Sequence, residues 1–150
     1  MKKIILLSIF SLNLFALNTG DKIPQSLSNY IGLNVENKIY IIDFFASWCN
    51  SCKKELPLIS KIHNSKNSIY QIIGIDVDKN VNKGIAFQKK LNLKFKIIND
   101  PQSNVISVFN PIGMPTIYYV KNRTILKIIP GAVKNIDQQI LSDIKNIEGQ

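Results

Sequence analysis

The chain has 150 residues, 45% of them hydrophobic, without an internal repeat or a Pro-, Gly- or Ser-rich linker, which predicts one domain around one core. It carries 19 Lys and Arg against 10 Asp and Glu, a net charge of +9. The lysines are scattered, Arg123 is the only arginine and no aromatic residues interleave them, so nucleic-acid binding is disfavoured and a basic surface for anionic lipid or an acidic partner is favoured.

Residues 1–20 have the pattern of an export signal. Two lysines follow Met1, and the apolar run Ile4 to Phe15 is shorter than the roughly 20 residues of a membrane span. We therefore expect residues 1–20 to be a signal peptide or an N-terminal membrane anchor, with residues 21–150 as the folded domain. Either outcome places that domain outside the cytoplasm, in the periplasm or an equivalent compartment.

The first predicted elements follow a stretch, residues 20–36, that shows no clear periodicity. Residues 38–46 are rich in Ile, Tyr and Phe over a short span, which predicts a buried strand. Residues 49–64 place apolar side chains at helical spacing, with Pro57 inside the pattern. A proline inside a helix removes one hydrogen bond and bends the axis.

Strands and helices continue to alternate along the rest of the chain. The predicted elements are a strand over 68–77, a helix over 81–91, a strand over 95–99, a short helix over 102–109, strands over 116–121 and 124–129, and an amphipathic helix over 135–147. The last two strands are joined through Asn122-Arg123, which suggests an antiparallel hairpin. This order predicts an α/β domain with a central sheet covered by helices on both faces.

The only two cysteines, Cys49 and Cys52, lie three residues apart at the end of the first predicted strand. A strand leading into a helix would put Cys49 at the helix N-terminus, where unpaired amides and the positive end of the dipole favour a thiolate. Such surroundings lower a thiol pKa from about 8.5 into a range of roughly 3.5 to 7.5. The pair therefore has the spacing and position of a redox-active dithiol.

Other roles for the two cysteines are less favoured. A structural disulfide is a weak staple here because it closes a short loop, and loop-entropy stabilisation grows with loop size. A metal site needs further ligands, and the only histidine, His63, is expected to be an exposed residue on the far part of the same helix. Peroxidase chemistry lacks a lone nucleophilic cysteine with its own arginine partner.

The sequence resembles the thioredoxin superfamily, and within it the exported TlpA/ResA group of thiol-disulfide oxidoreductases. The resemblance rests on DFFASWCNSCKKELP over residues 43–57 and on Gly113-Met114-Pro115-Thr116 about sixty residues later, and it covers roughly residue 38 to the C-terminus. It implies a thioredoxin fold, with a central mixed β-sheet flanked by helices on both faces.

The resemblance also implies roles for individual residues around the cysteines. Cys49 corresponds to the attacking thiol, Cys52 to the resolving thiol and Pro115 to the cis-proline beside the redox-active disulfide. A cis bond is inexpensive only before proline, and it turns the backbone of Met114 toward an extended substrate strand. Trp48 and Met114 are expected to offer apolar contacts to a substrate, although either could be ordinary core.

Two acidic residues complete the expected site. Asp43 corresponds to the buried acid of thioredoxins, a proton acceptor for the resolving thiol, and burial at a strand end would raise its pKa. Its alternative reading is a polar strand residue held by a neighbour. Glu55 corresponds to the acidic position that follows the cysteine pair in the exported group, and its alternative reading is a solvated glutamate that suits the helix dipole.

Two departures from the exported group bear on this reading. The segment 21–37 is shorter than the hairpin that usually opens the group, so we expect a reduced N-terminal edge of the domain. The dipeptide Asn50-Ser51 lacks the proline common between the cysteines, and this dipeptide helps to set the redox potential.

The expected function is a monomeric enzyme that exchanges dithiol and disulfide with cysteine-containing client proteins, without a bound cofactor or metal. The resemblance implies a reductant fed by a membrane electron donor, with cytochrome c biogenesis as one plausible task. A disulfide-donating oxidase and a non-catalytic binding or metal-ferrying module remain open alternatives.

Overall fold

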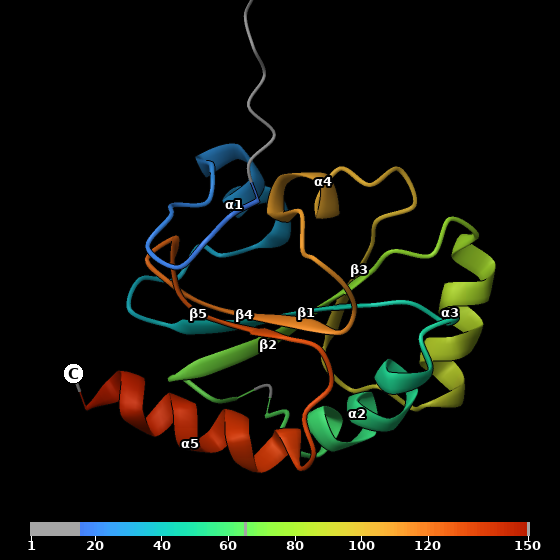
Figure 1. Cartoon of the computed structure of the whole chain (residues 1–150). Coiled ribbons are helices and arrows are strands. Elements are labelled where there is room, and N and C mark those ends of the chain that lie inside the picture. The colour runs from blue at the N-terminus through green and yellow to red at the C-terminus, as the bar shows by residue number, and fades with distance from the viewer. Residues whose placement is uncertain (1–15, 65, 150) are drawn as a thin grey trace, which may run out of the picture.

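The computed structural model describes residues 16–64 and 66–149, which form one five-stranded mixed sheet with helices on both faces (Figure 1). The strands lie in the order β3-β2-β1-β4-β5. Their bounds are β1 Ile39–Phe45, β2 Tyr70–Asp76, β3 Lys96–Asn99, β4 Thr116–Lys121 and β5 Thr124–Pro130. Strands β1, β2 and β3 run parallel, while β4 is antiparallel to both β1 and β5. The predicted mixed sheet and terminal hairpin are confirmed.

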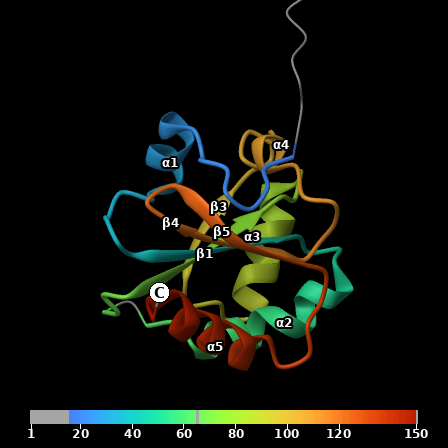
Figure 2. The same ribbon diagram turned by 60° about the vertical axis from the view of Figure 1, so that its left-hand side comes forward.

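Five helices are present in the described part of the chain. Their bounds are α1 Gln25–Ile31, α2 Asn50–Lys61, α3 Val81–Lys90, α4 Ile106–Phe109 and α5 Ile136–Glu148. Figures 1 and 2 show α1 and α4 on one side of the sheet and α2 and α5 on the other. Phe87 of α3 packs into the same cluster as α2 and α5, so α3 covers that side as well.

The sheet divides the core into two clusters because side chains alternate along each strand. In β1, Ile39, Ile41 and Phe45 pack against α2, α3 and α5, whereas Tyr40, Ile42 and Phe44 pack against α1 and α4. All seven residues of β1 are buried, as expected for a central strand covered on both faces. By this alternation Asp43 lies on the α2 side, beneath the cysteines.

The structure corrects the reading of residues 20–36 as a stretch without periodicity. Helix α1 lies there, and it begins after Pro24 and ends at Gly32, whose φ of 85° suits glycine. Its buried residues Leu27 and Ile31 are one turn apart, but two apolar positions in seven residues give a weak signal.

Two further element boundaries differ from the sequence prediction. Helix α4 begins at Ile106 rather than near residue 102, because the Asp100 carboxylate accepts the backbone N–H groups of Val105 and Ile106 and fixes the start there. Helix α2 ends at Lys61, so His63 lies beyond its end, half-buried, with its ring 6.4 Å from that of Phe95. The prediction of an exposed helical His63 is wrong.

The predicted export signal or anchor at residues 1–20 lies mostly outside the described residues. Of its last part, Leu17 packs against the α1/α4 side and its N–H donates to the Phe109 carbonyl at 3.1 Å. Gly20 N–H donates to the Ile125 carbonyl at 2.8 Å. Within residues 16–64 and 66–149, no helix has the length and apolar character that crossing a membrane requires.

Candidate active site around Cys49 and Cys52

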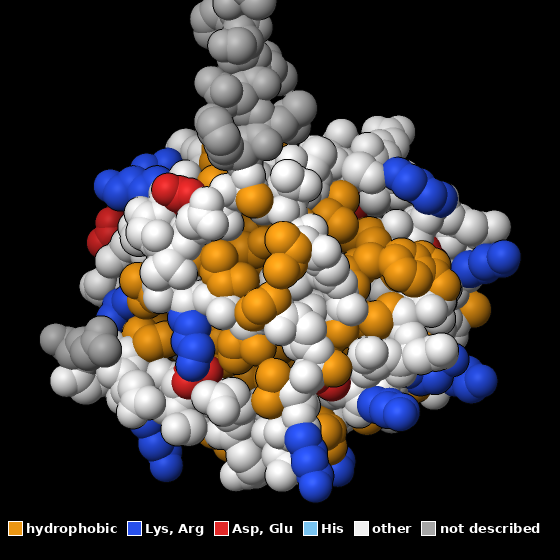
Figure 3. Space-filling view, viewed as in Figure 1, with side chains coloured by type: hydrophobic (Ala, Val, Ile, Leu, Met, Phe, Trp, Pro, Cys, Tyr) orange, Lys and Arg blue, Asp and Glu red, His pale blue; other side chains and the backbone are white. Residues whose placement is uncertain are grey.

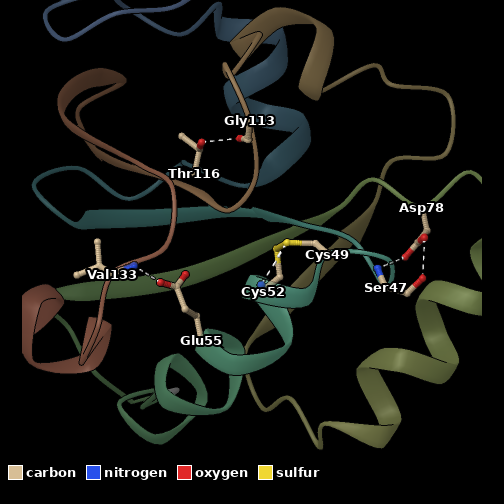
Figure 4. The surroundings of a disulfide bond; sticks show 8 residues. All are labelled: Ser47, Cys49, Cys52, Glu55, Asp78, Gly113, Thr116 and Val133. Carbon is tan, nitrogen blue, oxygen red and sulfur yellow. Dashed lines mark hydrogen bonds between the residues drawn. A yellow bond between two sulfur atoms is a disulfide. The ribbon is translucent and has the colours of Figure 1, made fainter.

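Cys49 and Cys52 form a disulfide at the point where β1 leads into α2 (Figure 4). Cys49 is the N-cap residue of α2, and the Cys52 N–H donates to Cys49 Sγ at 3.2 Å. The Cys49 N–H donates to the Ala46 carbonyl at 3.1 Å, which closes the turn after the strand. The predicted placement of Cys49 at a helix N-terminus is confirmed.

The surroundings of Cys49 favour a thiolate when the disulfide is opened. The first turn of α2 contains no acidic residue, and Lys53 and Lys54 follow on its exposed side. The free amides and dipole of the helix therefore act on Cys49 without a nearby acid on the same turn. Cys49 is 6% exposed and Cys52 is 1% exposed, so Cys49 is the more accessible of two largely buried cysteines.

The loop before β4 carries the predicted proline. The Met114–Pro115 peptide bond is cis, as the resemblance implied, and the Thr116 hydroxyl donates to the Gly113 carbonyl at 2.7 Å. Met114 is half-buried and packs against both core clusters. This loop therefore joins the two sides of the core.

Two large apolar side chains project from the loops at this end of the sheet. Trp48 directly precedes Cys49 and is 65% exposed, and Ile112 lies two residues before Met114 and is 90% exposed. Figure 3 shows hydrophobic side chains gathered across the middle of one face, with most Lys and Arg side chains around its margin. The exposure of Trp48 agrees with a surface role, while Met114 contributes at least partly to the core.

Asp43 is buried beneath the site at 1% exposure. Its Oδ1 has no hydrogen-bond partner. Burial raises the pKa of this carboxyl well above its ordinary value, and the charge of Glu55 raises it further. The expected rise in pKa is present, and no neighbouring group holds Oδ1 as the alternative reading would require.

Glu55 lies on α2 and is 4% exposed, so the alternative reading of a solvated glutamate is wrong. Its Oε1 accepts the backbone N–H of Val133, from the loop between β5 and α5, while Oε2 has no partner (Figure 4). Burial raises the pKa of Glu55, and the Val133 hydrogen bond partly opposes that rise. Two buried carboxyls, those of Asp43 and Glu55, thus lie on the α2 side of the sheet.

An open pocket of about 410 Å³ adjoins Glu55. The first two turns of α2 form one side of it and the β5–α5 loop forms the other. Its lining residues are Asn50, Ser51, Lys54, Glu55, Leu58, Ala132, Val133, Lys134 and Asn135. Glu55 is therefore the one carboxyl of the pair that borders a surface pocket.

Two sets of buried polar groups were not singled out from the sequence. Asp78 follows β2 and binds Ser47, two residues before Cys49. Because β1 and β2 are parallel neighbours, the residues that follow them lie at the same edge of the sheet. A predicted parallel pairing of these two strands would therefore have placed Asp78 close to Ser47. The second set is Tyr119 with Asp143, whose proximity depends on how α5 packs against β4.

Comparison with known proteins gives a consistent result. The AhpC/TSA family model matches residues 11–129. The ResA thiol-disulfide oxidoreductase of Geobacillus thermodenitrificans is 28% identical over 141 residues, covering 87% of this chain and 74% of ResA. Thioredoxin 2 of Plasmodium berghei is 36% identical over 64 residues, so the match spans less than half of either chain.

Solved structures with the same arrangement have lower sequence identity. The thiol:disulfide interchange protein DsbE from Chlorobium tepidum aligns with a TM-score of 0.70 at 23% identity, covering 86% of this chain and 99% of that structure. StoA from Bacillus subtilis aligns with a TM-score of 0.65 at 21% identity, covering 75% and 86%. These similarities confirm the predicted thioredoxin-like fold.

Proposed function

This chain belongs to the AhpC/TSA family and is a protein-disulfide oxidoreductase, and we propose that it reduces disulfides of client proteins outside the cytoplasm. The observation that carries the proposal is the Cys49–Cys52 disulfide at the N-cap of α2, above the buried carboxyls of Asp43 and Glu55. The resemblance to the exported TlpA/ResA group implies the reducing direction and an extracytoplasmic location.

The proposed reaction moves two electrons from the dithiol to the client. The Cys49 thiolate attacks one sulfur of the client disulfide, forms a mixed disulfide and releases the other client sulfur as a thiolate. Cys52 then loses its proton and attacks Cys49 Sγ, which releases the second client sulfur and restores the Cys49–Cys52 disulfide. A dithiol donor must reduce that disulfide again, and the family resemblance points to a membrane protein.

The buried carboxyls are suited to handling the protons of this cycle. Asp43 has a raised pKa, so it can accept the Cys52 proton and return it closer to neutral pH than an ordinary aspartate. Glu55 raises the pKa of Asp43 further and borders the surface pocket, through which a proton can reach solvent. Asp43 thus serves the resolving step and Glu55 tunes it.

The carboxyls also favour a reductant over an oxidase. A strongly oxidising couple requires a stabilised reduced form, in which the attacking sulfur is a thiolate. When Asp43 or Glu55 is ionised, its negative charge opposes that thiolate, offsets the stabilisation by the N-terminus of α2 and so lowers the reduction potential. The TlpA/ResA resemblance further points to haem-binding cysteines of cytochrome c as clients that must be kept reduced.

The reduction potential of the Cys49/Cys52 couple tests the direction of the reaction. The protein is equilibrated with defined thiol-disulfide buffers, and the reduced fraction is measured by alkylation and mass. We expect a value of about −270 mV or lower, near that of thioredoxin. A value near −120 mV would instead identify a disulfide-donating oxidase.

Trapping of clients tests exchange itself. The Cys52→Ser variant lacks the resolving thiol, so mixed disulfides through Cys49 should accumulate on extracytoplasmic proteins. Cys49→Ser is the matched control and should trap far less. If neither variant forms covalent complexes, the chain is a binding module rather than an exchange enzyme.

A further inference from the structure

Asp78 is bound to the segment that carries the attacking cysteine. Its Oδ2 accepts the backbone N–H of Ser47 at 2.7 Å, and its Oδ1 accepts the Ser47 hydroxyl at 2.9 Å (Figure 4). Asp78 is only 5% exposed. Hydrogen bonds to a charged acceptor are among the stronger ones in proteins, so this two-point contact is a firm tether.

The tether is anchored behind Asp78 by three elements of the fold. The Asp78 N–H donates to Asp76 Oδ1 at 2.9 Å, at the end of β2. Gln88 of α3 donates through Nε2 to Asp76 Oδ2 at 2.6 Å and to Asn99 Oδ1 of β3 at 2.8 Å. Asp78 is therefore held to β2, and through Asp76 and Gln88 to α3 and β3, by contacts that do not involve the Ser47 loop.

The segment that Asp78 holds contains the parts a client would meet first. Ser47 is followed by Trp48, which is 65% exposed, and then by Cys49. The other backbone bond within this turn joins the Cys49 N–H to the Ala46 carbonyl. Without the Asp78 carboxylate, Ser47 would lose the acceptors of its backbone N–H and of its hydroxyl. The disulfide and the hydrogen bonds of α2 would remain.

We propose that Asp78 is a positioning residue that holds Ser47–Cys49 in one orientation, so that Trp48 and Cys49 Sγ engage a protein disulfide together. The inference rests on the proposed exchange function, but it holds for either direction of electron flow. Asp78 itself touches neither the client nor the sulfurs. Its effect should fall on docking of a protein client rather than on the intrinsic chemistry of the thiol.

The test compares a protein client with a small disulfide that needs no docking. With insulin as the disulfide client, Asp78→Ala should raise KM about tenfold with kcat changed less than about threefold. With bis(2-hydroxyethyl) disulfide, the rate of the same variant should stay within about twofold of wild type. Asp78→Asn retains one acceptor oxygen and should recover most of the insulin KM.

A second pair of variants separates positioning from loss of stability. Asp100→Ala is the matched control, because Asp100 is 3% exposed and, like Asp78, accepts hydrogen bonds from two groups of one segment. Its donors are the Val105 and Ile106 backbone N–H groups at the start of α4. Asp100→Ala should lower the melting temperature without raising the insulin KM. Ser47→Ala removes only the hydroxyl contact, and its effect should not add to that of Asp78→Ala.

Three results would overturn the positioning role. They are a KM in Asp78→Ala no higher than in Asp100→Ala, an equal loss of rate with the small disulfide, and no recovery in Asp78→Asn. The proposed function fails differently, because the wild type would then not reduce insulin. If the wild type instead only oxidises a reduced dithiol peptide, the same KM comparison is made in that direction, and inactivity in both directions overturns both proposals.

Discussion

The two faces of the central sheet treat buried polar groups differently. On the α1/α4 face, Ser28 donates to the Leu33 carbonyl at 3.3 Å, Tyr118 donates to the Phe109 carbonyl at 3.5 Å, and Tyr40 accepts the Val35 N–H. On the α2/α5 face, unpartnered buried side-chain oxygens occur, within the described residues, on Asp43, Glu55, Tyr119 and Asp143.

We call the α1/α4 face the stabilising face, because its polar groups are hydrogen-bonded, and the α2/α5 face the working face, because it carries the disulfide. A buried polar group without any partner costs about 1–3 kcal/mol. Glu55 and Asp143 are each hydrogen-bonded through their other oxygen, so the unpartnered oxygens on this side lower its stability by less than four such costs. They lie on the face that holds Cys52 and Leu56 in its core. Buried side-chain oxygens without hydrogen-bond partners are expected near a catalytic site, and among the described residues they occur only on the side that carries the disulfide.

The largest expected effect breaks the stabilising face. Phe44 is fully buried, and its ring lies 5.1 Å from Phe109 and 5.7 Å from Tyr118. Phe44→Ala should lower the free energy of unfolding by about 3–5 kcal/mol, measured by denaturant titration of the oxidised protein. The reduction potential should not change, and a change of more than about 30 mV would show that the two faces are coupled.

A smaller effect should appear when the working face loses Asp43. Its pKa is raised in the folded state, so between the ordinary value near 3.9 and the folded value the native protein binds more protons than the unfolded chain. Wild-type stability therefore falls as pH rises through that window, by up to about 1.4 kcal/mol per pH unit from this group.

Asp43→Asn removes this contribution, so the variant should become more stable relative to the wild type as pH rises above about 4. Denaturant titrations of both oxidised proteins across pH measure this slope. The variant should also release trapped clients more slowly, with a changed pH profile. Parallel stability curves and an unchanged profile would return Asp43 to a purely structural role.

The smallest expected effect concerns Tyr119, whose buried hydroxyl lies beside the Asp143 carboxylate without a well-formed hydrogen bond. Burial raises its pKa first, and the neighbouring Asp143 carboxylate raises it further. Tyr119→Phe removes this hydroxyl and keeps the ring, so the melting temperature should stay equal or rise, with a gain of roughly 1 kcal/mol at most. A clear loss would mean that the hydroxyl has a partner in solution.

Patterns local in sequence predicted most of the fold. The Ile- and Phe-rich strand before the cysteines, the Asn122-Arg123 hairpin and the closing helix all have a clear periodicity, and their bounds agree with the structure to within a few residues. Helix α1 was missed because only Leu27 and Ile31 mark its buried side with apolar residues, and its third buried residue is Ser28.

The details of the site depend on contacts between distant segments. Glu55 is buried because the β5–α5 loop brings the Val133 N–H to it, 78 residues along the chain. Asp78 reaches Ser47 across 31 residues through the register of two parallel strands. No helical or strand period encodes such pairs, so the sequence could nominate Glu55 without revealing its burial and did not nominate Asp78.

One contact at the disulfide gives the molecule a built-in spectroscopic label. The Cys52 N–H points at Cys49 Sγ, so the group that changes oxidation state is also the acceptor for this amide. A thiolate is a stronger acceptor than a disulfide sulfur, because the acceptor then carries a full charge. The amide resonance of Cys52 in a nitrogen–proton NMR spectrum should therefore report the redox state and the titration of Cys49 directly, without a dye or a reaction at sulfur.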